Sequence, residues 1–269
     1  MKRTAVDQAE GLRRMFAADA THMVALVGDE AQDITAALAV ALAGQGRKVL
    51  LLDEQVSRGD THPLSALAVT YDIGAVVRGE KSLQEIVVSV AGITLLPAAI
   101  DRDIHGADAA RVRLLAGFHA LSSLYDIVLV HAGQTPHRRS LGFALAAPEV
   151  IILCDGSSVG ITASYGQIKL MARSPGKRHF HLMFRGVETM LAKILFRNLA
   201  SVCRQHLQLM PDFAGAFPLD QKAAADAMET LASEMTQWPV LERDDSRFEA
   251  FMHRLLTATS ARRTATAEH

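Results

Sequence analysis

The sequence predicts an α/β fold in which a doubly wound, mostly parallel sheet carries helices on both faces. Short apolar segments alternate with longer helical segments along the chain, which is the order that parallel sheets with right-handed crossovers require. Most apolar segments are continuous, as in strands buried on both faces. The chain has 269 residues, of which 49% are hydrophobic and 21% charged, and this size suits one large domain.

Six strands are expected where the apolar runs lie, at 22–27, 48–53, 93–97, 126–130, 149–154 and 179–184. The longer segments between them have helical patterns, at 33–44, 107–123, 159–173 and 187–208.

Both ends of the chain differ in composition from this core. We expect an N-terminal amphipathic interaction helix at 1–16, a tether at 17–21, the α/β domain at 22–258 and a flexible tail at 259–269.

Charge and cysteine content exclude some classes of function. The 28 Lys and Arg against 29 Asp and Glu give a net charge of −1, so no overall field attracts nucleic acid. Cys154 and Cys203 lie in apolar segments, as buried thiols do in a reducing cytosol. Because no apolar run approaches the ~18 residues of a spanning helix, we expect a cytoplasmic protein, at most peripheral to the inner membrane.

The first strand is followed by the turn where such sheets hold phosphate. Residues 28–35 read GDEAQDIT, with one glycine, no lysine and three carboxylates. A phosphate loop needs glycines for close backbone approach and a lysine for charge, so this turn opposes anion binding.

Several segments carry a resemblance to a known family. The runs AALAVALAGQGRKVLLLD, LYDIVLVHAG and APEVIILCDGSSVGITASYGQIKLM resemble the MinD and ParA-type deviant Walker ATPases, over most of the chain. The N-terminal DQAEGLRRM resembles the DQAxxLR motif of the FlhG (FleN) flagellar regulators within that group. The matching residues are Asp7, Gln8, Ala9, Leu12 and Arg13.

The resemblance implies a P-loop NTPase-like fold that binds ATP and Mg²⁺ between two subunits. This chain lacks both phosphate-loop lysines, the D-A-D signature has become Asp53-Glu54-Gln55, and His131 stands where the family has an aspartate. We therefore expect a pseudo-ATPase with no cofactor and no metal. Its vestigial nucleotide site would comprise Gly28, Asp53, His131 and Gly133.

The N-terminal segment has one apolar stripe that ends at Phe16. A helix of this length is marginal in water, so the stripe packs either on its own domain or on a partner. The resemblance implies a partner, the GTPase FlhF, whose GTP hydrolysis the segment would stimulate. The residues assigned to that contact are Asp7, Gln8, Ala9, Leu12, Arg13 and Phe16.

Two further patterns leave alternatives open. Phe248, Phe251, Met252 and Leu255 have the spacing of a membrane-surface helix or of an ordinary final helix that covers the sheet, so we expect weak or no membrane contact. His179 and His181 point to one face of a strand, but with no helpful Cys, Asp or Glu nearby in the sequence we predict no metal there.

The resemblance thus implies a regulator of bacterial flagellar number or placement that acts on an FlhF-type GTPase, in the cytoplasm or at the cell pole. The other partners considered are a flagellar switch (C-ring) protein and a flagellar transcription activator, for which the protein would be an antiactivator. The alternatives are an active MinD-like ATPase that dimerises on the membrane, or another positioning or secretion regulator of the same fold.

Overall fold

The structure is a computed structural model that describes residues 22–28, 31–62, 64, 68–99, 113–114, 116–118, 121, 124–132, 143–173 and 179–238. The interaction helix and tether expected at 1–21, residues 248–256 and the tail at 259–269 lie outside these ranges.

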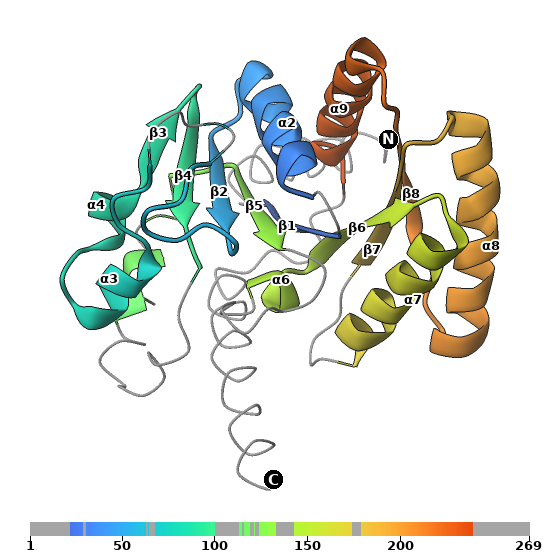
Figure 1. Ribbon diagram of the computed structural model, residues 1–269, viewed down its shortest axis with the longest axis horizontal. Helices are drawn as coiled ribbons and strands as arrows, with labels where there is room; N and C mark the ends of the chain where they lie inside the picture. The colour runs from blue at the N-terminus through green and yellow to red at the C-terminus, as the bar shows by residue number, and fades with distance from the viewer. Residues whose placement is uncertain are drawn as a thin grey trace, which may run out of the picture.

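An eight-stranded sheet in the order β3-β4-β2-β5-β1-β6-β7-β8 forms the centre of the molecule (Figure 1). The edge strand β3 is antiparallel to β4 and every other pairing is parallel. The strands are β1 (His22–Val27), β2 (Val49–Asp53), β3 (Val88–Val90), β4 (Ile93–Pro97), β5 (Ile127–Ala132), β6 (Glu149–Asp155), β7 (His179–Arg185) and β8 (Asp212–Phe217).

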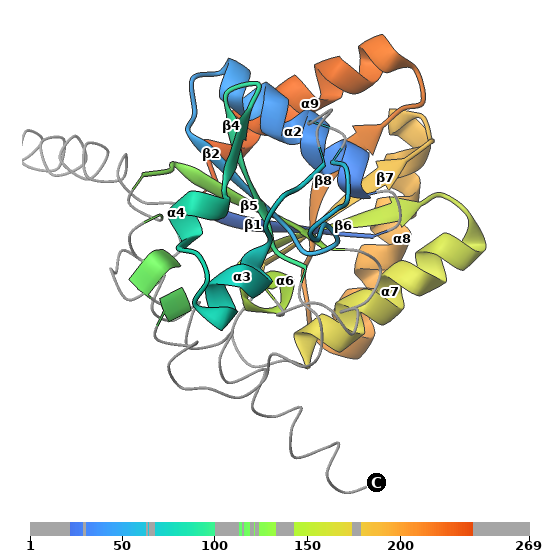
Figure 2. The same cartoon turned by 60° about the vertical axis from the view of Figure 1, so that its left-hand side comes forward.

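Helices cover both faces of the sheet (Figure 2), as the sequence predicts. One face packs against α2 (Ala31–Gly44) and α9 (Gln221–Met235). The helices on the other face are α3 (Ile73–Arg78), α4 (Leu83–Ile86), α6 (Phe143–Ala146), α7 (Ser158–Ala172) and α8 (Thr189–Leu207). The fold is therefore a three-layer, doubly wound α/β domain.

All six predicted strands and the three helices near 33–44, 159–173 and 187–208 are confirmed, with ends that differ by a few residues. Of the helix expected at 107–123, the described residues 113–114, 116–118 and 121 are helical. The sequence reasoning missed the strands β3 and β8, the short helices α3, α4 and α6, and the longer helix α9. In α9 the buried Ala224, Met228, Leu231 and Met235 have helical spacing, so its pattern was present in the sequence.

Side-chain caps explain where the helices begin. The hydroxyl of Ser157 accepts a hydrogen bond from the Gly160 N–H at the start of α7, and the carboxylate of Asp220 accepts one from the Ala223 N–H at the start of α9. Asp72 accepts in the same way from Gly74 at the start of α3. These bonds satisfy amides that the helix itself leaves unpaired.

Both cysteines are free and buried, as expected. Burial raises the pKa of the Cys154 thiol to about 12 and that of Cys203 to about 11. Both thiols are therefore protonated at neutral pH, and they serve as small apolar side chains of the core.

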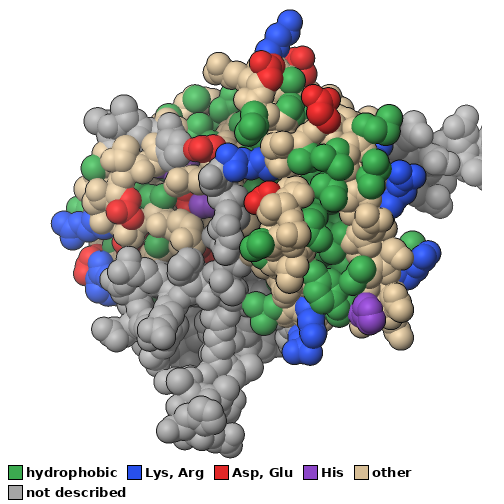
Figure 3. All heavy atoms as spheres, turned by 45° about the vertical axis from the view of Figure 1, so that its right-hand side comes forward, with side chains coloured by type: hydrophobic (Ala, Val, Ile, Leu, Met, Phe, Trp, Pro, Cys, Tyr) green, Lys and Arg blue, Asp and Glu red, His purple; other side chains and the backbone are tan. Residues whose placement is uncertain are grey.

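The outward face of α7 and α8 exposes apolar side chains (Figure 3). Val159 on α7 is 78% exposed. On α8, Met190 is 72% exposed, and Leu191 and Ile194 are exposed as well. These apolar side chains are exposed on the surface and are not part of the buried core.

The first turn of the domain contains a glycine that tight packing requires. Gly28 has φ 149°, and a Cβ there would lie 2.7 Å from Cβ and 2.9 Å from the carbonyl oxygen of Leu153 on β6. Gly28 therefore lets β1 end directly against the backbone of its neighbour strand.

We predict that Gly28→Ala lowers the free energy of unfolding by about 2–4 kcal/mol, because the new methyl group meets backbone and the φ angle is strained. Urea denaturation measures this. Gly46→Ala is the matched control, since Gly46 also has a positive φ of 80° but open space around it, and it should cost only about 1 kcal/mol. Equal losses in the two variants would contradict the close-packing role of Gly28.

Candidate functional site

The candidate site lies at the carboxyl ends of β1, β2 and β5, where parallel α/β sheets bind ligands. In the register of the sheet, Asp53 at the end of β2 stands opposite His131 on β5. Because paired residues of parallel strands project to the same side, the topology alone brings this carboxyl group and this imidazole together. Residues 29–30 and Gly133, from the predicted site, lie outside the described ranges.

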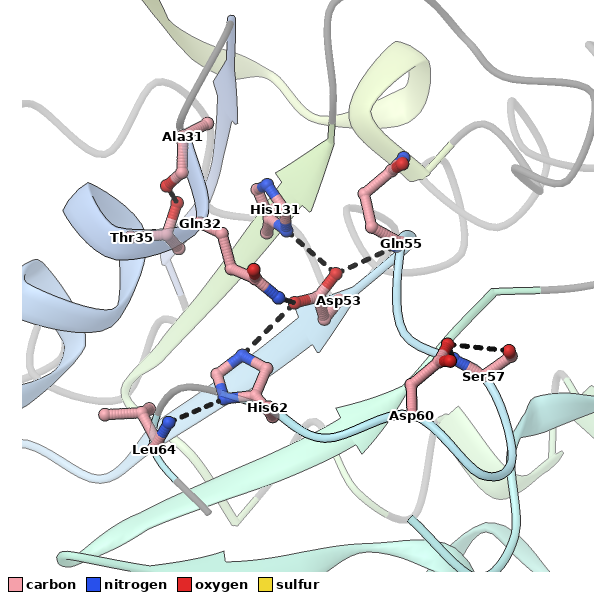
Figure 4. Close-up of polar contacts among 10 residues, drawn as sticks. All are labelled: Ala31, Gln32, Thr35, Asp53, Gln55, Ser57, Asp60, His62, Leu64 and His131. Atoms are coloured by element: carbon pink, nitrogen blue, oxygen red, sulfur yellow. Dashed lines mark hydrogen bonds and ion pairs between the residues drawn. The ribbon is translucent and has the colours of Figure 1, made fainter. Parts of the chain in front are cut away.

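The carboxylate of Asp53 is at the centre of the site and is fully buried. Four hydrogen bonds converge on it (Figure 4). Its Oδ1 lies 2.8 Å from Nδ1 of His131 and accepts the Gln55 N–H at 2.8 Å. Its Oδ2 lies 3.1 Å from Nε2 of His62 and accepts from Nε2 of Gln32 at 3.2 Å.

The hydrogen-bond partners fix how the two imidazoles are protonated. Nδ1 of His62 accepts the Leu64 N–H at 3.1 Å, so it has no hydrogen and the hydrogen lies on Nε2, which donates to Asp53. An ionised carboxylate can only accept, so Nδ1 of His131 carries a hydrogen as well. Both histidines therefore act as donors to one carboxylate.

These donors keep Asp53 ionised. Burial by itself would raise the pKa of the carboxyl group, but the hydrogen bonds from His131 and His62, the positive potential of His131 and the Gln55 amide outweigh it. The pKa of Asp53 consequently falls well below its usual range.

Glu54, the next residue, is also buried and joins two further segments. Its Oε1 accepts the Phe143 N–H at 2.8 Å, at the start of α6, while its own N–H donates to the His131 carbonyl at 3.0 Å. The carboxylates of Asp53, the last residue of β2, and of Glu54, which follows it, thus both hold parts of the fold together.

The start of α2 takes part in the same internal bonding. Gln32, in its first turn, donates to Asp53, and the hydroxyl of the buried Thr35 donates back to the Ala31 carbonyl at 2.5 Å. Ala31 and Ile34 are buried as well. In a phosphate loop, a Ser or Thr hydroxyl at the start of the helix would hold Mg²⁺. Here the Thr35 hydroxyl instead donates to a carbonyl of its own helix.

Mg²⁺ does not fit the Asp53 carboxylate as it is bonded in the described residues. A hard cation needs the oxygen lone pairs of carboxylates, but those of Asp53 face four hydrogen-bond donors. Within the described ranges, no group of three His, Cys, Asp or Glu side chains is arranged to hold a metal ion. The four donors around Asp53 make this carboxylate part of a buried hydrogen-bond network with a structural role.

The structure brings together three of the predicted site residues, Gly28, Asp53 and His131, at one end of the sheet. The sequence reasoning missed Gln32, Glu54 and His62. His62 comes from the connection between β2 and α3, where no periodic pattern fixes the direction of a side chain. The predicted partner-contact residues 7–16 and the helix residues 248–255 lie outside the description.

The remaining histidine prediction concerns β7. His181 bonds to Glu149 on β6 with Nε2 and Oε2 2.8 Å apart, so an acidic neighbour exists that is distant in the sequence.

No helix in the described part of the chain has the length and hydropathy needed to cross a bilayer.

Comparison with known proteins confirms the resemblance found in the sequence. No family model matches the chain. The chain is similar to the antiactivator FleN of Pseudomonas aeruginosa, with 23% identity over 246 residues that cover 83% of this chain and 88% of FleN. FleN and FlhG are names for the same group of regulators, so the curated relative and the N-terminal motif point to one group.

Solved structures confirm the fold. The MinD cell division protein of Aquifex aeolicus superposes with a TM-score of 0.59 at 17% identity, covering 83% of this chain and all of MinD. Cobyrinic acid a,c-diamide synthase of Mycobacterium smegmatis, solved with bound ADP and magnesium, gives 0.59 at 20% identity, covering 81% of this chain and 95% of the synthase. The architecture is therefore the P-loop NTPase-like fold of MinD and ParA proteins.

We predict that Asp53→Asn lowers the free energy of unfolding by about 2–4 kcal/mol, because the amide NH₂ would face buried donors that need an acceptor. Urea denaturation at pH 7 measures the loss. Asp60→Asn is the control, since this exposed side chain accepts from Ser57 through one oxygen that asparagine retains, and it should cost less than about 1 kcal/mol. A fully stable Asp53→Asn variant would contradict the central role of the carboxylate.

The depressed pKa of Asp53 also predicts a pH dependence. As pH falls below the unfolded-state pKa of about 4, the unfolded chain takes up the proton first, so the stabilisation is present above that pH and declines below it. The difference in unfolding free energy between the parent and Asp53→Asn should narrow as the pH falls from 5 towards 3. A free-energy difference that widens as the pH falls would contradict this prediction.

Proposed function

We propose that this protein is a regulator of bacterial flagellar number or placement, with an α/β domain that does not use ATP and an N-terminal segment that acts on a partner GTPase. The similarity to FleN over most of the chain supports the flagellar role. The segment DQAEGLRRM supports a partner of the FlhF type, because it matches the motif by which the FlhG group is recognised.

The observation that carries the pseudo-ATPase proposal is the saturated carboxylate of Asp53. An ATPase of this fold needs an acidic group free to orient Mg²⁺ and its water ligands. Here Gln32, His62 and His131 all donate to that carboxylate, and the turn at 28–35 contains no lysine or arginine. The carboxyl edge thus supports a structural role for the residues that a nucleotide would otherwise contact.

A peptide that acts in trans does not need an ATP site in its own domain. Gln8 would then orient water or a switch residue of the GTPase, and Arg13 would face phosphate-side charge. The domain would present the segment without control by a nucleotide.

The similarity to FleN, an antiactivator, favours a second candidate: inhibition of a flagellar transcription activator. The protein would carry out this function by binding as well. The function is therefore compatible with an Asp53 carboxylate that is saturated by hydrogen bonds. It differs in the partner, which would be a transcription factor and not a GTPase.

We predict that Mg²⁺-ATP does not bind. Isothermal titration calorimetry should give no saturable heat, and 1 mM ATP should leave the thermal midpoint unchanged, whereas a ligand at 100 times its Kd would add about 2.7 kcal/mol of stability. AMP serves as the control for nonspecific effects. Micromolar, Mg²⁺-dependent affinity would favour the alternative of an active MinD-like ATPase.

The partner proposal predicts that the full chain stimulates GTP turnover by the FlhF of the same organism. The Gln8→Ala, Arg13→Ala double variant should lose the stimulation. Arg14→Ala is the matched control, because it removes the same charge one residue away and should retain the activity. A double variant that stimulates as well as the parent overturns these residue roles, and if the parent does not stimulate either, a transcription activator becomes the partner to test.

A further inference from the structure

The helices α7 and α8 pack side by side on one face of the sheet, and they expose apolar side chains to solvent. Of the ten large apolar side chains that are exposed in the described ranges, six lie on these two helices. They are Val159 and Leu170 on α7, and Met190, Leu191, Ile194 and Val202 on α8. Exposed apolar side chains that gather in one patch mark a surface that binds a membrane or another molecule. The proposed function uses none of these residues.

Basic side chains lie among the apolar ones. They are Lys169 on α7, Arg173 at its C-cap, and Lys193, Arg197 and Arg204 on α8. All five are exposed, and within the described residues none of them forms an ion pair. Figure 3 shows lysine and arginine side chains near the apolar patch. This face thus combines apolar surface with positive charge that no described neighbour neutralises.

The charge of this part of the chain differs from that of the rest. Neither α7 nor α8 contains an aspartate or a glutamate. Residues 158–207, from the start of α7 to the end of α8, contain eight Lys and Arg and one acid, Glu188, which gives a net charge of +7. Because the whole chain has a net charge of −1, the other residues sum to −8. On the opposite face of the sheet, α2 and α9 contain four acids and one lysine. An anionic surface would therefore attract the molecule with α7 and α8 towards it.

The apolar and the basic side chains project in the same direction. On α8 they recur at intervals of three or four residues, as Met190, Ile194 and Arg197 do, and such positions lie on one side of a helix. On α7, Leu170 and Arg173 have the same spacing. The opposite sides of both helices contribute to the core beneath them. A ligand that approaches this side of the molecule consequently meets apolar and charged side chains together.

We propose that the outward face of α7 and α8 binds the surface of an anionic membrane. At such a surface, cations meet the phosphate groups of the lipids while exposed apolar side chains enter the boundary of the acyl chains. Nucleic acid would use the cations but not the apolar side chains, because its interfaces with proteins are polar. A helical peptide would need an apolar groove, whereas these side chains project outward from two helices. The binding requires neither a nucleotide nor the residues around Asp53.

Co-sedimentation of the full-length protein with vesicles tests the proposal. Vesicles of phosphatidylcholine with about 30% phosphatidylglycerol should bind the protein at least about tenfold more tightly than vesicles of phosphatidylcholine alone, in about 0.1 M salt. Raising the salt to about 0.5 M should weaken this binding, because salt screens the cations. Equal binding to both kinds of vesicle, or no binding to either, overturns the proposal. Binding to a short DNA duplex without binding to anionic vesicles would overturn it in favour of nucleic acid.

Two charge variants assign the effect to α8. The Lys193→Gln, Arg197→Gln double variant should bind the anionic vesicles about 25-fold more weakly, because each cation near such a surface contributes about fivefold. The Arg47→Gln, Lys48→Gln double variant is the matched control, since it removes two exposed cations from the connection between α2 and β2, and it should bind like the parent. A Lys193→Gln, Arg197→Gln variant that binds like the parent overturns the proposal, and residues 248–255 would then be the segment to test for membrane contact.

The apolar part of the face is tested separately. Met190→Ser should weaken binding to anionic vesicles several-fold, because the side chain no longer enters the lipid while the charge is unchanged. Met210→Ser is the control, since Met210 is also 72% exposed but lies beyond the end of α8, and it should bind like the parent. Equal losses in the two variants, or no loss in Met190→Ser, overturn the proposal. Far-UV circular dichroism establishes that all variants are folded. None of these measurements uses a flagellar partner or GTP, so their failure is distinguishable from failure of the proposed function.

Discussion

The convergence of four hydrogen bonds on the Asp53 carboxylate is the interaction on which the carboxyl edge of this molecule depends. Through it, β2 is tied to β5 by His131, to the start of α2 by Gln32 and to the following connection by His62. A buried ionised carboxylate is costly unless it is fully satisfied, so each of these segments must keep its position for the charge to be tolerated. The same bonds use the lone pairs that a divalent cation would need.

The fold that this chain shares with MinD does not depend on the chemistry of the carboxyl edge. The sheet order and the helices depend on apolar side chains buried on both faces of the strands, and these residues are independent of the ligand edge. Gly28 illustrates the separation. It stands where a phosphate loop would begin, yet its contact with Leu153 of β6 is sufficient reason for a glycine there, whether or not phosphate binds.

The two edges of the sheet therefore differ in what they offer. At the carboxyl edge, the described residues around Asp53 and Glu54 are joined by internal hydrogen bonds. The amino edge holds the hydrogen bond between His181 and Glu149 and the stack of His181 on Trp238.

The sequence by itself determined the fold class, six of the strands and the absence of lysine from the first turn, because these depend on local composition and on periodicity that neighbouring residues express. It also placed Asp53 and His131 at the ends of two strands, and parallel pairing makes such positions neighbours. Only the tertiary structure decided that His62 and Gln32 donate hydrogen bonds to Asp53. The same holds for His181, which bonds to Glu149 and stacks on Trp238. These contacts join residues between 9 and 57 positions apart, and their partners are set by how the connections run across the sheet, which no local pattern encodes.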